Sequence, residues 1–531
     1  MVKRLVCLVA TSAACASPVP LDVKIVDPCN KPVLASLGLL GYEARGTDLG
    51  AGLSAFTVEG DKAFADVPIP LVSDFQLVVL GYEGDRPKAL PDAAGVSARY
   101  DLTSASDPVT ITVPIAPFND FYKPTNLAAP TMCTALSRAR HGATATWVPS
   151  IGKVVIIGGE SIVDGSKLYP RTVEAFDPKT GMFETIYEFK RQEGGERAYH
   201  TATLISGDRI LIAGGEFSDG SMAASIRTVV LLDVHDASAV AVEAVPPTGF
   251  LTDERAGHTA VKLANGEVAF MGGRKLVPQS SNPMDQQFQG TIEVFSPDTK
   301  FMYRPNGAPA LEQARYGHSA TVLGTGKDVM VVGGYNENGP LRSIEVVHLE
   351  GKMGMNRVTN TGTTTGVGPI YHAAAVDEAG RVMLSGGYGS IADADPSNVP
   401  ITIPKNPSNA VELWQFNDAT ATLSRVCTDS MSVARGRHAS AMSGDLAVFV
   451  GGHDADGTTL ATGEFATYRP TGTCFVTRPT IKTMNDQRAR FSLVELGSGE
   501  LLAVGGYRWL PTEPVYTSIS GAELFSPRRK P

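Results

Sequence analysis

The sequence predicts an all-β protein, in which a small β-sandwich precedes a seven-bladed β-propeller built from four-stranded sheets. A pair of glycines ends a short hydrophobic run seven times, and successive pairs lie about 53 to 65 residues apart. A repeat of about this length with strand-like content is typical of propellers. The 55 glycines, 35 prolines and 19% charged residues also favour a turn-rich β protein. The pairs begin at Gly158, Gly214, Gly272, Gly333, Gly386, Gly451 and Gly505.

Residues 1–16 are expected to be an export signal. Lys3 and Arg4 precede an apolar run that ends near residue 14, and small residues follow it, which is the order of a secretory signal. Two processing schemes stay open. Residues 12–15 resemble a bacterial lipobox, although Ser12 stands where that family prefers leucine. This scheme predicts an outer-membrane or cell-surface lipoprotein that is held on the bilayer by an acylated Cys15. Residues 14–16 instead fit an ordinary peptidase site, which predicts free secretion.

Both processing schemes leave four cysteines in the body of the chain, and an even number in an exported chain favours two disulfides. Cys427 and Cys474 lie in the outer parts of consecutive repeats, so we expect them to pair. Cys29 then pairs with Cys133. The sequence alone leaves three connectivities open.

Residues 18–115 lack the repeat and are expected to form the β-sandwich. The stretch 21–26 alternates apolar and polar residues, and the stretches 75–80 and 111–115 are apolar strand candidates. Turn-forming residues follow the first of these, at 27–30. The order of these segments resembles the carboxypeptidase-regulatory-like sandwiches that are attached to exported bacterial proteins, over about 95 residues.

From residue 119 to residue 531 one four-strand unit recurs. Its first strand follows an Arg-x-x-His motif, as at Arg197 to His200, and its second ends in the glycine pair. The third strand contains a glutamate, as in the segment 292–295, and the fourth is short, as in the segment 301–303. These motifs resemble the kelch repeat over about 410 residues, and the resemblance implies a kelch-type β-propeller.

The ends of this region are expected to complete one sheet. The last copy stops after its third strand, at 522–525, whereas residues 120–124 precede the first copy as residues 301–305 precede the fourth. Pairing of residues 120–124 with the last copy would close the ring. It would also cover two sheet edges that otherwise invite aggregation.

Three polar positions recur in the repeat and are expected to be structural, because an active site occurs once. Buried arginine and glutamate need partners, yet Pro369 replaces arginine in copy five and Val230 replaces glutamate in copy two. These copies are not neighbours in a ring of seven, so an Arg–Glu pair is expected to be optional. The positions are His141, His200, His258, His318, His372 and His438 with Phe491 in copy seven, Arg138, Arg197, Arg255, Arg315, Arg435 and Arg488, and Glu174, Glu293, Glu345, Glu412, Glu464 and Glu523.

Candidate ligand-binding residues are those that differ between copies. If the kelch resemblance holds, the residue directly after each glycine pair lies at the mouth of the central channel. A polar ring of this kind could receive a sugar or a peptide side chain, and a water-filled pore mouth is the alternative. The residues are Glu160, Glu216, Arg274, Tyr335, Tyr388, His453 and Tyr507.

The sequence favours a binding or interaction protein without a catalytic site, and we expect neither a metal nor another cofactor. It contains no nucleophile elbow, P-loop, zincin motif or CxxC, and the net charge of −9 gives no reason to expect nucleic acid. No apolar run beyond the N-terminus is long enough to span a membrane. The expected partner is a protein or a glycan, and exposed aromatic residues such as Trp509 and Tyr516 would favour this reading.

A carbohydrate-active enzyme is the alternative. Galactose-oxidase-type enzymes share the kelch propeller, and Tyr335, Tyr388 and His453 could form part of a copper site. The bacterial kelch epimerase that interconverts sialic acid anomers needs only acid–base groups, which residues such as Glu160 and His453 could supply.

Overall fold

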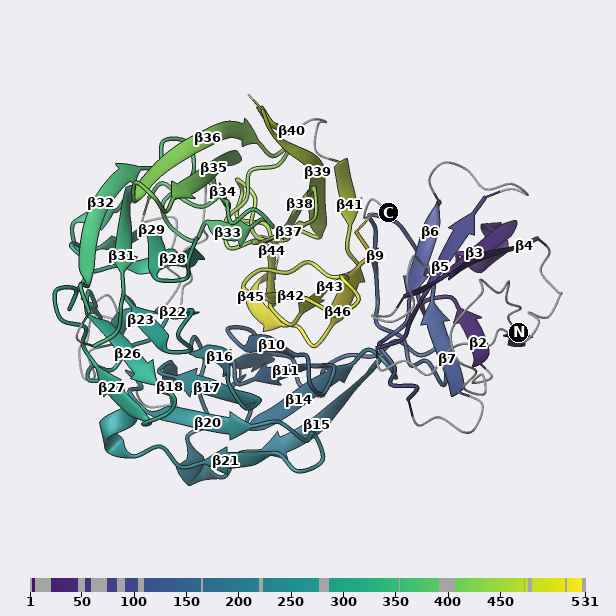
Figure 1. Cartoon of the computed structure of the whole chain (residues 1–531), viewed down its shortest axis with the longest axis horizontal. Helices are drawn as coiled ribbons and strands as arrows, with labels where there is room; N and C mark the ends of the chain where they lie inside the picture. Colours follow the sequence, from purple (N-terminus) through teal and green to yellow (C-terminus); the bar gives the residue numbers. More distant parts are fainter. Residues whose placement is uncertain are drawn as a thin grey trace.

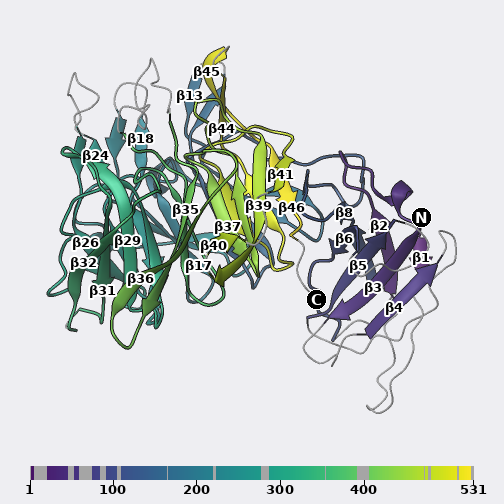
Figure 2. The ribbon, with the colours of Figure 1, turned by 90° about the horizontal axis from the view of Figure 1, so that it is seen from above.

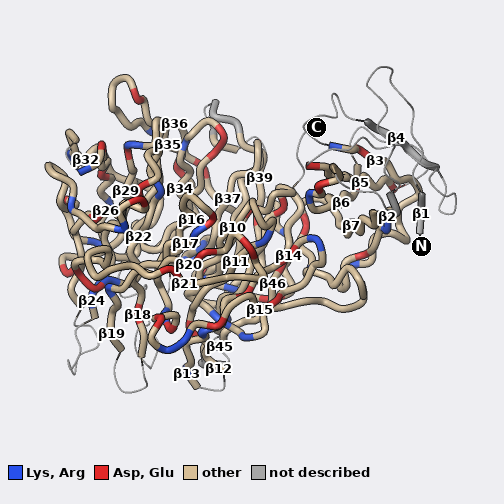
Figure 3. Tube along the Cα trace, turned by 60° about the horizontal axis from the view of Figure 1, so that its bottom comes forward, with Lys and Arg blue, Asp and Glu red and all other residues tan. Residues whose placement is uncertain are grey.

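The chain is all-β, and short 3-10 turns are the only helical elements in the part that the computed structural model describes. No helix in that part is long and apolar enough to cross a bilayer. Acidic and basic residues are interspersed along the strands (Figure 3). The described residues are 2–4, 21–45, 53–58, 74–83, 91–103, 109–163, 166–218, 223–276, 286–352, 354–390, 406–471, 473–475, 480–510 and 513–527. The expected lipid anchor Cys15 lies outside them.

Two sheets near the N-terminus pack on one core, as Figure 1 shows to one side of the ring. Buried Val23, Leu77 and Ile111 come from both sheets and meet in that core. The first sheet has the order β1 (Val2–Arg4), β2 (Leu21–Val26), β7 (Val109–Pro114), and its β2–β7 pair is parallel. The second has the order β4 (Leu53–Val58), β3 (Leu39–Arg45), β5 (Gln76–Tyr82), β6 (Ala93–Val96), β8 (Ala116–Pro117).

Groups of four antiparallel strands then follow one another, and we call them units 1 to 7 in chain order. In each unit the strand before the glycine pair is central and buried, because hydrophobic side chains line both of its faces. β40 (Thr473–Phe475) bridges units 5 and 6. Units 1 to 3 are β10 (Thr144–Val148), β11 (Lys153–Ile157), β14 (Thr172–Asp177) and β15 (Met182–Glu188), then β16 (Thr201–Ile205), β17 (Arg209–Ala213), β20 (Val229–Asp233) and β21 (Ala241–Glu243), then β22 (Thr259–Lys262), β23 (Val268–Met271), β26 (Ile292–Ser296) and β27 (Phe301–Tyr303).

The remaining units follow the same order. Unit 4 also carries the short strand β30 (Gly339–Pro340). Units 4 to 7 are β28 (Tyr316–Leu323), β29 (Asp328–Asn336), β31 (Ser343–His348) and β32 (Arg357–Thr363), then β33 (Ala373–Val376), β34 (Val382–Ser385), β35 (Ala410–Asn417) and β36 (Thr422–Ser430), then β37 (Ala439–Ser443), β38 (Leu446–Val450), β39 (Thr462–Thr471) and β41 (Thr480–Thr483), then β42 (Ser492–Glu495), β43 (Leu501–Val504), β46 (Ala522–Phe525) and β9 (Phe121–Tyr122).

The units are arranged around a central axis (Figure 1). The first strand of each unit lies beside the first strand of the next, and β42 of unit 7 lies beside β10 of unit 1. The predicted pairing of the two ends is confirmed: β9 is hydrogen-bonded to β46, with Tyr122 opposite Leu524. The strand that completes unit 7 therefore comes from a segment some 400 residues earlier in the chain.

Two-stranded hairpins leave the units directly after the glycine pairs and rise from one face of the ring (Figure 2). We call this the hairpin face. β12 of unit 1 lies beside β45 of unit 7, and β19 of unit 2 lies beside β24 of unit 3. The hairpins are β12 (Ser161–Val163) with β13 (Ser166–Leu168), β18 (Glu216–Ser218) with β19 (Ala223–Ser225), β24 (Arg274–Leu276) with β25 (Gln286–Phe288), and β44 (Tyr507–Leu510) with β45 (Glu513–Ser518).

Both predicted disulfides are present. Cys427–Cys474 joins the outer strand of unit 5 to β40. Cys29–Cys133 joins the turn after β2 to the segment between β9 and β10. Around the second bridge, Lys31 pairs with Asp120 at 2.8 Å and its Nζ also donates to the Phe121 carbonyl at 2.9 Å. The N-terminal sheets are thus fastened to the segment that completes unit 7.

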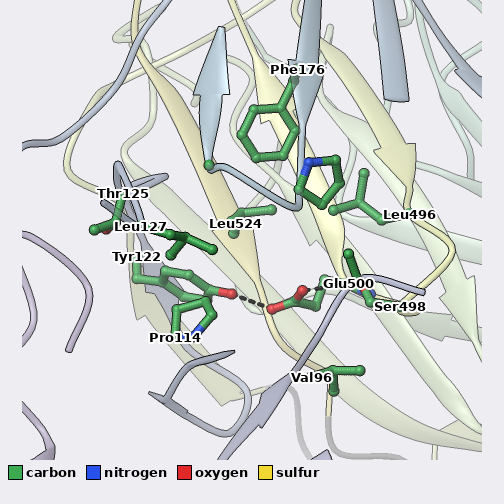
Figure 4. Close-up of a pocket in the computed structure, with 13 residues that line it drawn as sticks. Val96, Pro114, Tyr122, Thr125, Leu127, Phe176, Leu496, Ser498, Glu500 and Leu524 are labelled. Carbon is green, nitrogen blue, oxygen red and sulfur yellow. Dashed lines mark hydrogen bonds between the residues drawn. The ribbon is translucent and has the colours of Figure 1, made fainter. Parts of the chain in front are cut away.

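A cavity of about 30 Å³ lies where the N-terminal sheets meet units 1 and 7 (Figure 4). Inside it the Tyr122 hydroxyl donates to Glu500, whose pKa is raised by burial. Tyr303 and Glu267 make the equivalent contact in unit 3, at 2.8 Å. Because the pair recurs, we interpret it as part of the repeat and not as a separate site.

Candidate functional site

In the six units that carry it, the repeated arginine ties the segment before the first strand to the end of the second strand and the start of the third. Arg197 Nη1 donates to the carbonyls of Gly214 and Thr228, at 2.9 and 3.1 Å. In five units the guanidinium of the repeated arginine also contacts a fully buried glutamate of the third strand. These pairs are Arg140–Glu174, Arg255–Glu293, Arg315–Glu345, Arg435–Glu464 and Arg488–Glu523.

The structure corrects the predicted alignment of copy one. Arg140, and not the exposed Arg138, makes the contacts of the repeated arginine, with Nη1 at 3.2 Å from the Gly158 carbonyl. Ala143 therefore takes the position of the repeated histidine, and His141 lies two residues before it. The sequence 138–141 matches Arg-x-x-His by coincidence, because it carries two arginines.

The two units that lack one partner satisfy the other differently. Glu412 in unit 5 accepts the backbone N–H groups of Thr365 and Gly366, at 2.9 and 2.7 Å. In unit 2, Val230 leaves Arg197 with carbonyl and hydroxyl acceptors only, and burial lowers the pKa of Arg197 to about 10. Arg425 also lies 3.8 Å from Glu412. Both Glu412 and Arg197 are buried without their partner from the repeat, so the contact between the repeated arginine and glutamate is optional, as predicted.

The repeated histidines join neighbouring units. Each ring Nε2 lies within hydrogen-bonding distance of a hydroxyl on the preceding unit, and burial lowers the pKa of each ring, to about 3 for His200 and His318 and about 4 for His372. The contacts are His200–Thr144 at 3.0 Å, His258–Thr201 at 2.9 Å, His318–Thr259 at 3.0 Å, His372–Ser319 at 2.7 Å and His438–Ser385 at 2.9 Å.

The residue directly before the repeated histidine position reaches the axis, and the seven such residues form what we call the axial ring. Their backbones are linked from unit to unit by N–H···O=C bonds, including one from Gly142 of unit 1 to Arg490 of unit 7 at 3.5 Å. Further links run from Tyr199 to Gly142, from Gly257 to Tyr199, from Tyr371 to Gly317, from Arg437 to Tyr371 and from Arg490 to Arg437.

The axial ring adopts the left-handed backbone conformation throughout. Three members are glycines, which adopt it without strain, but Tyr199, Tyr371, Arg437 and Arg490 also have φ between 49° and 55°. Left-handed backbone costs about 1–2 kcal/mol for a residue with a Cβ. Strain of this kind gathers at functional sites. Four large side chains at the axis therefore point to a function that glycine could not serve.

The candidates chosen from the sequence lie just behind the axial ring. Each one pairs its backbone with the residue before an axial residue, as Glu160 does with His141. The side chains of all seven are buried, which does not fit the alternative of a water-filled pore mouth formed by them. The seven are Glu160, Glu216, Arg274, Tyr335, Tyr388, His453 and Tyr507.

Glu160 is the centre of a charged network. His141 Nε2 lies 2.9 Å from its Oε1, the axial Tyr199 hydroxyl donates to the same oxygen at 2.7 Å, and Lys167 contacts Oε2. Burial alone would raise the pKa of Glu160, but His141 and Lys167 hold it well below the usual range. Burial and the Glu160 charge raise the pKa of Tyr199, so its hydroxyl stays a donor.

The other candidates form pairs of their own. Arg274 Nη2 lies 3.3 Å from Glu216 Oε2. The Tyr388 hydroxyl lies 3.3 Å from His453 Nδ1, and burial holds the pKa of His453 well below its usual value. Tyr335 packs in a hydrophobic cluster with Tyr388.

Two axial arginines lie against tyrosine rings. Arg490 Cζ is 5.1 Å from the ring centroids of both Tyr199 and Tyr371. Arg437 Cζ is 4.5 Å from the centroid of Tyr371, and its Nη1 donates to the Tyr507 hydroxyl at 3.1 Å. Arg437 is buried, whereas Tyr199, Tyr371 and Arg490 are half-buried and line the axis.

Sequence reasoning missed the axial residues, although a signal was present. The position before the repeated histidine reads Gly, Tyr, Gly, Gly, Tyr, Arg, Arg around the ring, whereas histidine occupies the next position in five of the seven units. The exposed aromatic residues that would have favoured a protein or glycan binder are not found at the two positions named for them. Trp509 and Tyr516 are only 3% and 6% exposed, because they pack with Tyr507 inside the β44–β45 hairpin.

No family model and no curated protein matches this chain. Among solved structures, that of the protein YjhT is similar to this chain, with a TM-score of 0.45 and 13% sequence identity. The similarity covers 65% of this chain and 98% of YjhT.

Proposed function

We propose that this chain is an exported, seven-bladed kelch-type β-propeller that binds a protein or glycan ligand at the axis of its hairpin face and catalyses no reaction. Its seven consecutive four-strand units, neighbouring inner strands and shared last sheet support the propeller. Two disulfides support an oxidising compartment. Mass spectrometry of the mature N-terminus distinguishes a lipoprotein acylated on Cys15 from a freely secreted protein.

The strained axial side chains carry the proposal. Glycine at three equivalent positions makes the same backbone turn without strain, so Tyr199, Tyr371, Arg437 and Arg490 are not needed to build the ring. Three of them are half-buried and therefore accessible along the axis. Aromatic faces beside charged groups are typical of sites that bind sugars or peptide side chains.

A binding screen with an axial variant tests this proposal. The variant combines Tyr199→Gly, Tyr371→Gly, Arg437→Gly and Arg490→Gly, and Ala421→Gly is the matched control. Ala421 also has a left-handed backbone, with φ of 50°, but lies in an exposed turn of unit 5. We expect glycan-array or peptide-library ligands of the wild type to be lost by the axial variant and kept by the control. Equal binding by all three folded proteins would refute the proposal.

A carbohydrate-active enzyme is the second candidate, and the His141–Glu160 contact favours it. This buried pair touches the axial Tyr199, so acid–base groups lie next to the proposed site. A kelch epimerase acting on sialic acid would need no more than that. The test is anomer exchange followed by NMR with wild type and His141→Gln. If the wild type accelerates anomer exchange and the variant does not, the protein is a carbohydrate-active enzyme and the binding-protein proposal is wrong.

The galactose-oxidase-like alternative has less support. Such enzymes cross-link a cysteine to a ligand tyrosine, whereas Cys29, Cys133, Cys427 and Cys474 are all in disulfides. In its favour, two of the suspected copper ligands, Tyr388 and His453, are within hydrogen-bonding distance of each other. Elemental mass spectrometry of the purified protein tests this alternative, because stoichiometric copper would establish it.

A further inference from the structure

We propose that the axial site recognises a carboxylate, and that Arg490 is the residue that binds it. This inference rests on the proposed function, because it names the chemistry of a ligand at the same site. It arises from the surroundings of one guanidinium and not from the fold.

Arg490 differs from most arginines of the repeat in having no carboxylate within ion-pair distance among the described residues. Arg255, for comparison, contacts Glu293, and Arg274 contacts Glu216. The Arg490 guanidinium instead lies against the rings of Tyr199 and Tyr371. A half-buried cation has lost part of its hydration, and an anionic partner compensates for that loss. An anionic ligand would supply the missing partner.

The nearby carboxylate is already neutralised. Glu160 accepts hydrogen bonds from His141 and Tyr199 and contacts the ammonium of Lys167. Its charge is therefore matched within unit 1 and its hairpin, and the site keeps the positive charge of Arg490. Arg437 adds a second cation against the same Tyr371 ring.

The geometry favours a carboxylate over a phosphate. The centroids of two tyrosine rings lie 5.1 Å from Arg490 Cζ, and the planar N–H edge of its guanidinium has no hydrogen-bond acceptor among the described residues. That edge matches a carboxylate in a bidentate, planar arrangement. The tyrosine rings offer apolar surface to the carbon skeleton that carries the carboxylate, whereas a phosphate group would need donors on several sides.

The test uses matched pairs of probes: hexuronic acids with their amides, and glutamate-ended peptides with their glutamine counterparts. Affinities are measured by calorimetry for wild type, Arg490→Gln and Arg357→Gln. Arg357 is exposed on the outer strand β32, so its variant removes the same charge away from the axis. We expect the wild type and Arg357→Gln to prefer an acid by about 30-fold over its amide, and Arg490→Gln to prefer it by less than about 3-fold.

Each outcome is decisive. A wild type that binds amides as tightly as acids, binds only inorganic phosphate or binds no probe in the panel overturns the inference. If neutral probes bind and Tyr371→Gly abolishes that binding, the proposed axial function stands and only the carboxylate is wrong. If bound probes are indifferent to both Arg490→Gln and Tyr371→Gly, both proposals fail. If Arg490→Gln does not fold, Arg490→Lys is used in its place. Lysine keeps the positive charge but lacks the planar pair of N–H donors, so we expect this variant to bind the acid about 10-fold more weakly than the wild type.

Discussion

His200 Nε2 lies 3.0 Å from Thr144 Oγ1 across the boundary between units 2 and 1. The same contact crosses four further boundaries, always from a histidine to a hydroxyl of the preceding unit. Burial lowers the pKa of these rings, and a neighbouring arginine lowers that of His200 further. The histidines are therefore neutral in the folded protein, which makes the joints between units sensitive to acid.

We predict that acid destabilises the protein well above the range where carboxylates titrate. The unfolded chain protonates histidine near pH 6.5, whereas folded His200 and His318 have pKa values of about 3 and folded His372 of about 4. Because the unfolded state binds more protons, stability is complete above about pH 6.5 and falls as the pH drops. These three rings alone contribute a slope of about 4 kcal/mol per pH unit between about pH 6 and pH 4. His258 and His438, whose pKa values burial also lowers, add to it. Urea unfolding across this range measures the slope.

The variant His318→Gln isolates the histidine contribution. It keeps a polar partner for Thr259 but cannot gain a proton, so the slope is expected to fall by about 1.4 kcal/mol per pH unit. An unchanged slope would mean that this ring does not titrate as described. Val376→Thr, at an exposed position of β33, serves as the control.

The architecture could be predicted from the sequence because it depends on features with a fixed period. Glycine pairs mark the end of each central strand, the segment at Tyr122 resembles the one at Tyr303, and the cysteines lie in matching places. The axial site could not be predicted in this way, because a left-handed backbone turn determines which residue of each unit reaches the axis. The sequence does not reveal that conformation, because Tyr199 and Arg490 look like ordinary strand residues in the motif.

We predict that Val230→Glu creates a sixth Arg–Glu pair in unit 2. Val230 occupies the position of the paired glutamates, and the buried Arg197 lacks a carboxylate there. A double-mutant cycle with Arg197→Met is expected to give a favourable coupling of about 2 kcal/mol or more, since the guanidinium is already desolvated. Additive effects in chemical denaturation would contradict the prediction. The reverse change, Glu293→Val, should cost about 3–5 kcal/mol if Arg255 depends on its partner.

The two disulfides are expected to stabilise different joints. In the chain-entropy relation, the separations of 104 and 47 residues correspond to about 5 and 4 kcal/mol. Replacing Cys29 and Cys133 by alanine should release the N-terminal sheets from the ring closure. Replacing Cys427 and Cys474 should loosen units 5 and 6. Limited proteolysis with mass spectrometry measures where each variant is first cut, and the same first cut in both variants would contradict the assignment.

The axial ring allows strain to be separated from function. At Arg490 we predict that glycine is better tolerated than alanine by about 1 kcal/mol, because alanine keeps the left-handed Cβ while both substitutions lose the tyrosine contacts. At Gly142 glycine is again preferred over alanine. The backbone of residue 142 has a φ of 62°, and a Cβ added there would lie 2.6 Å from Tyr199 Cε1. Gly142→Ala should therefore destabilise the protein by more than about 1 kcal/mol.

Equilibrium unfolding of Arg490→Gly, Arg490→Ala and Gly142→Ala measures these differences on one scale. If Arg490→Gly is as stable as the wild type but no longer binds ligand, the arginine has been retained for binding at a cost in backbone strain. If alanine is as good as glycine at position 490, the left-handed conformation carries no strain there. The argument that strain marks this ring as a functional site would then fail, although the charge argument for Arg490 would remain.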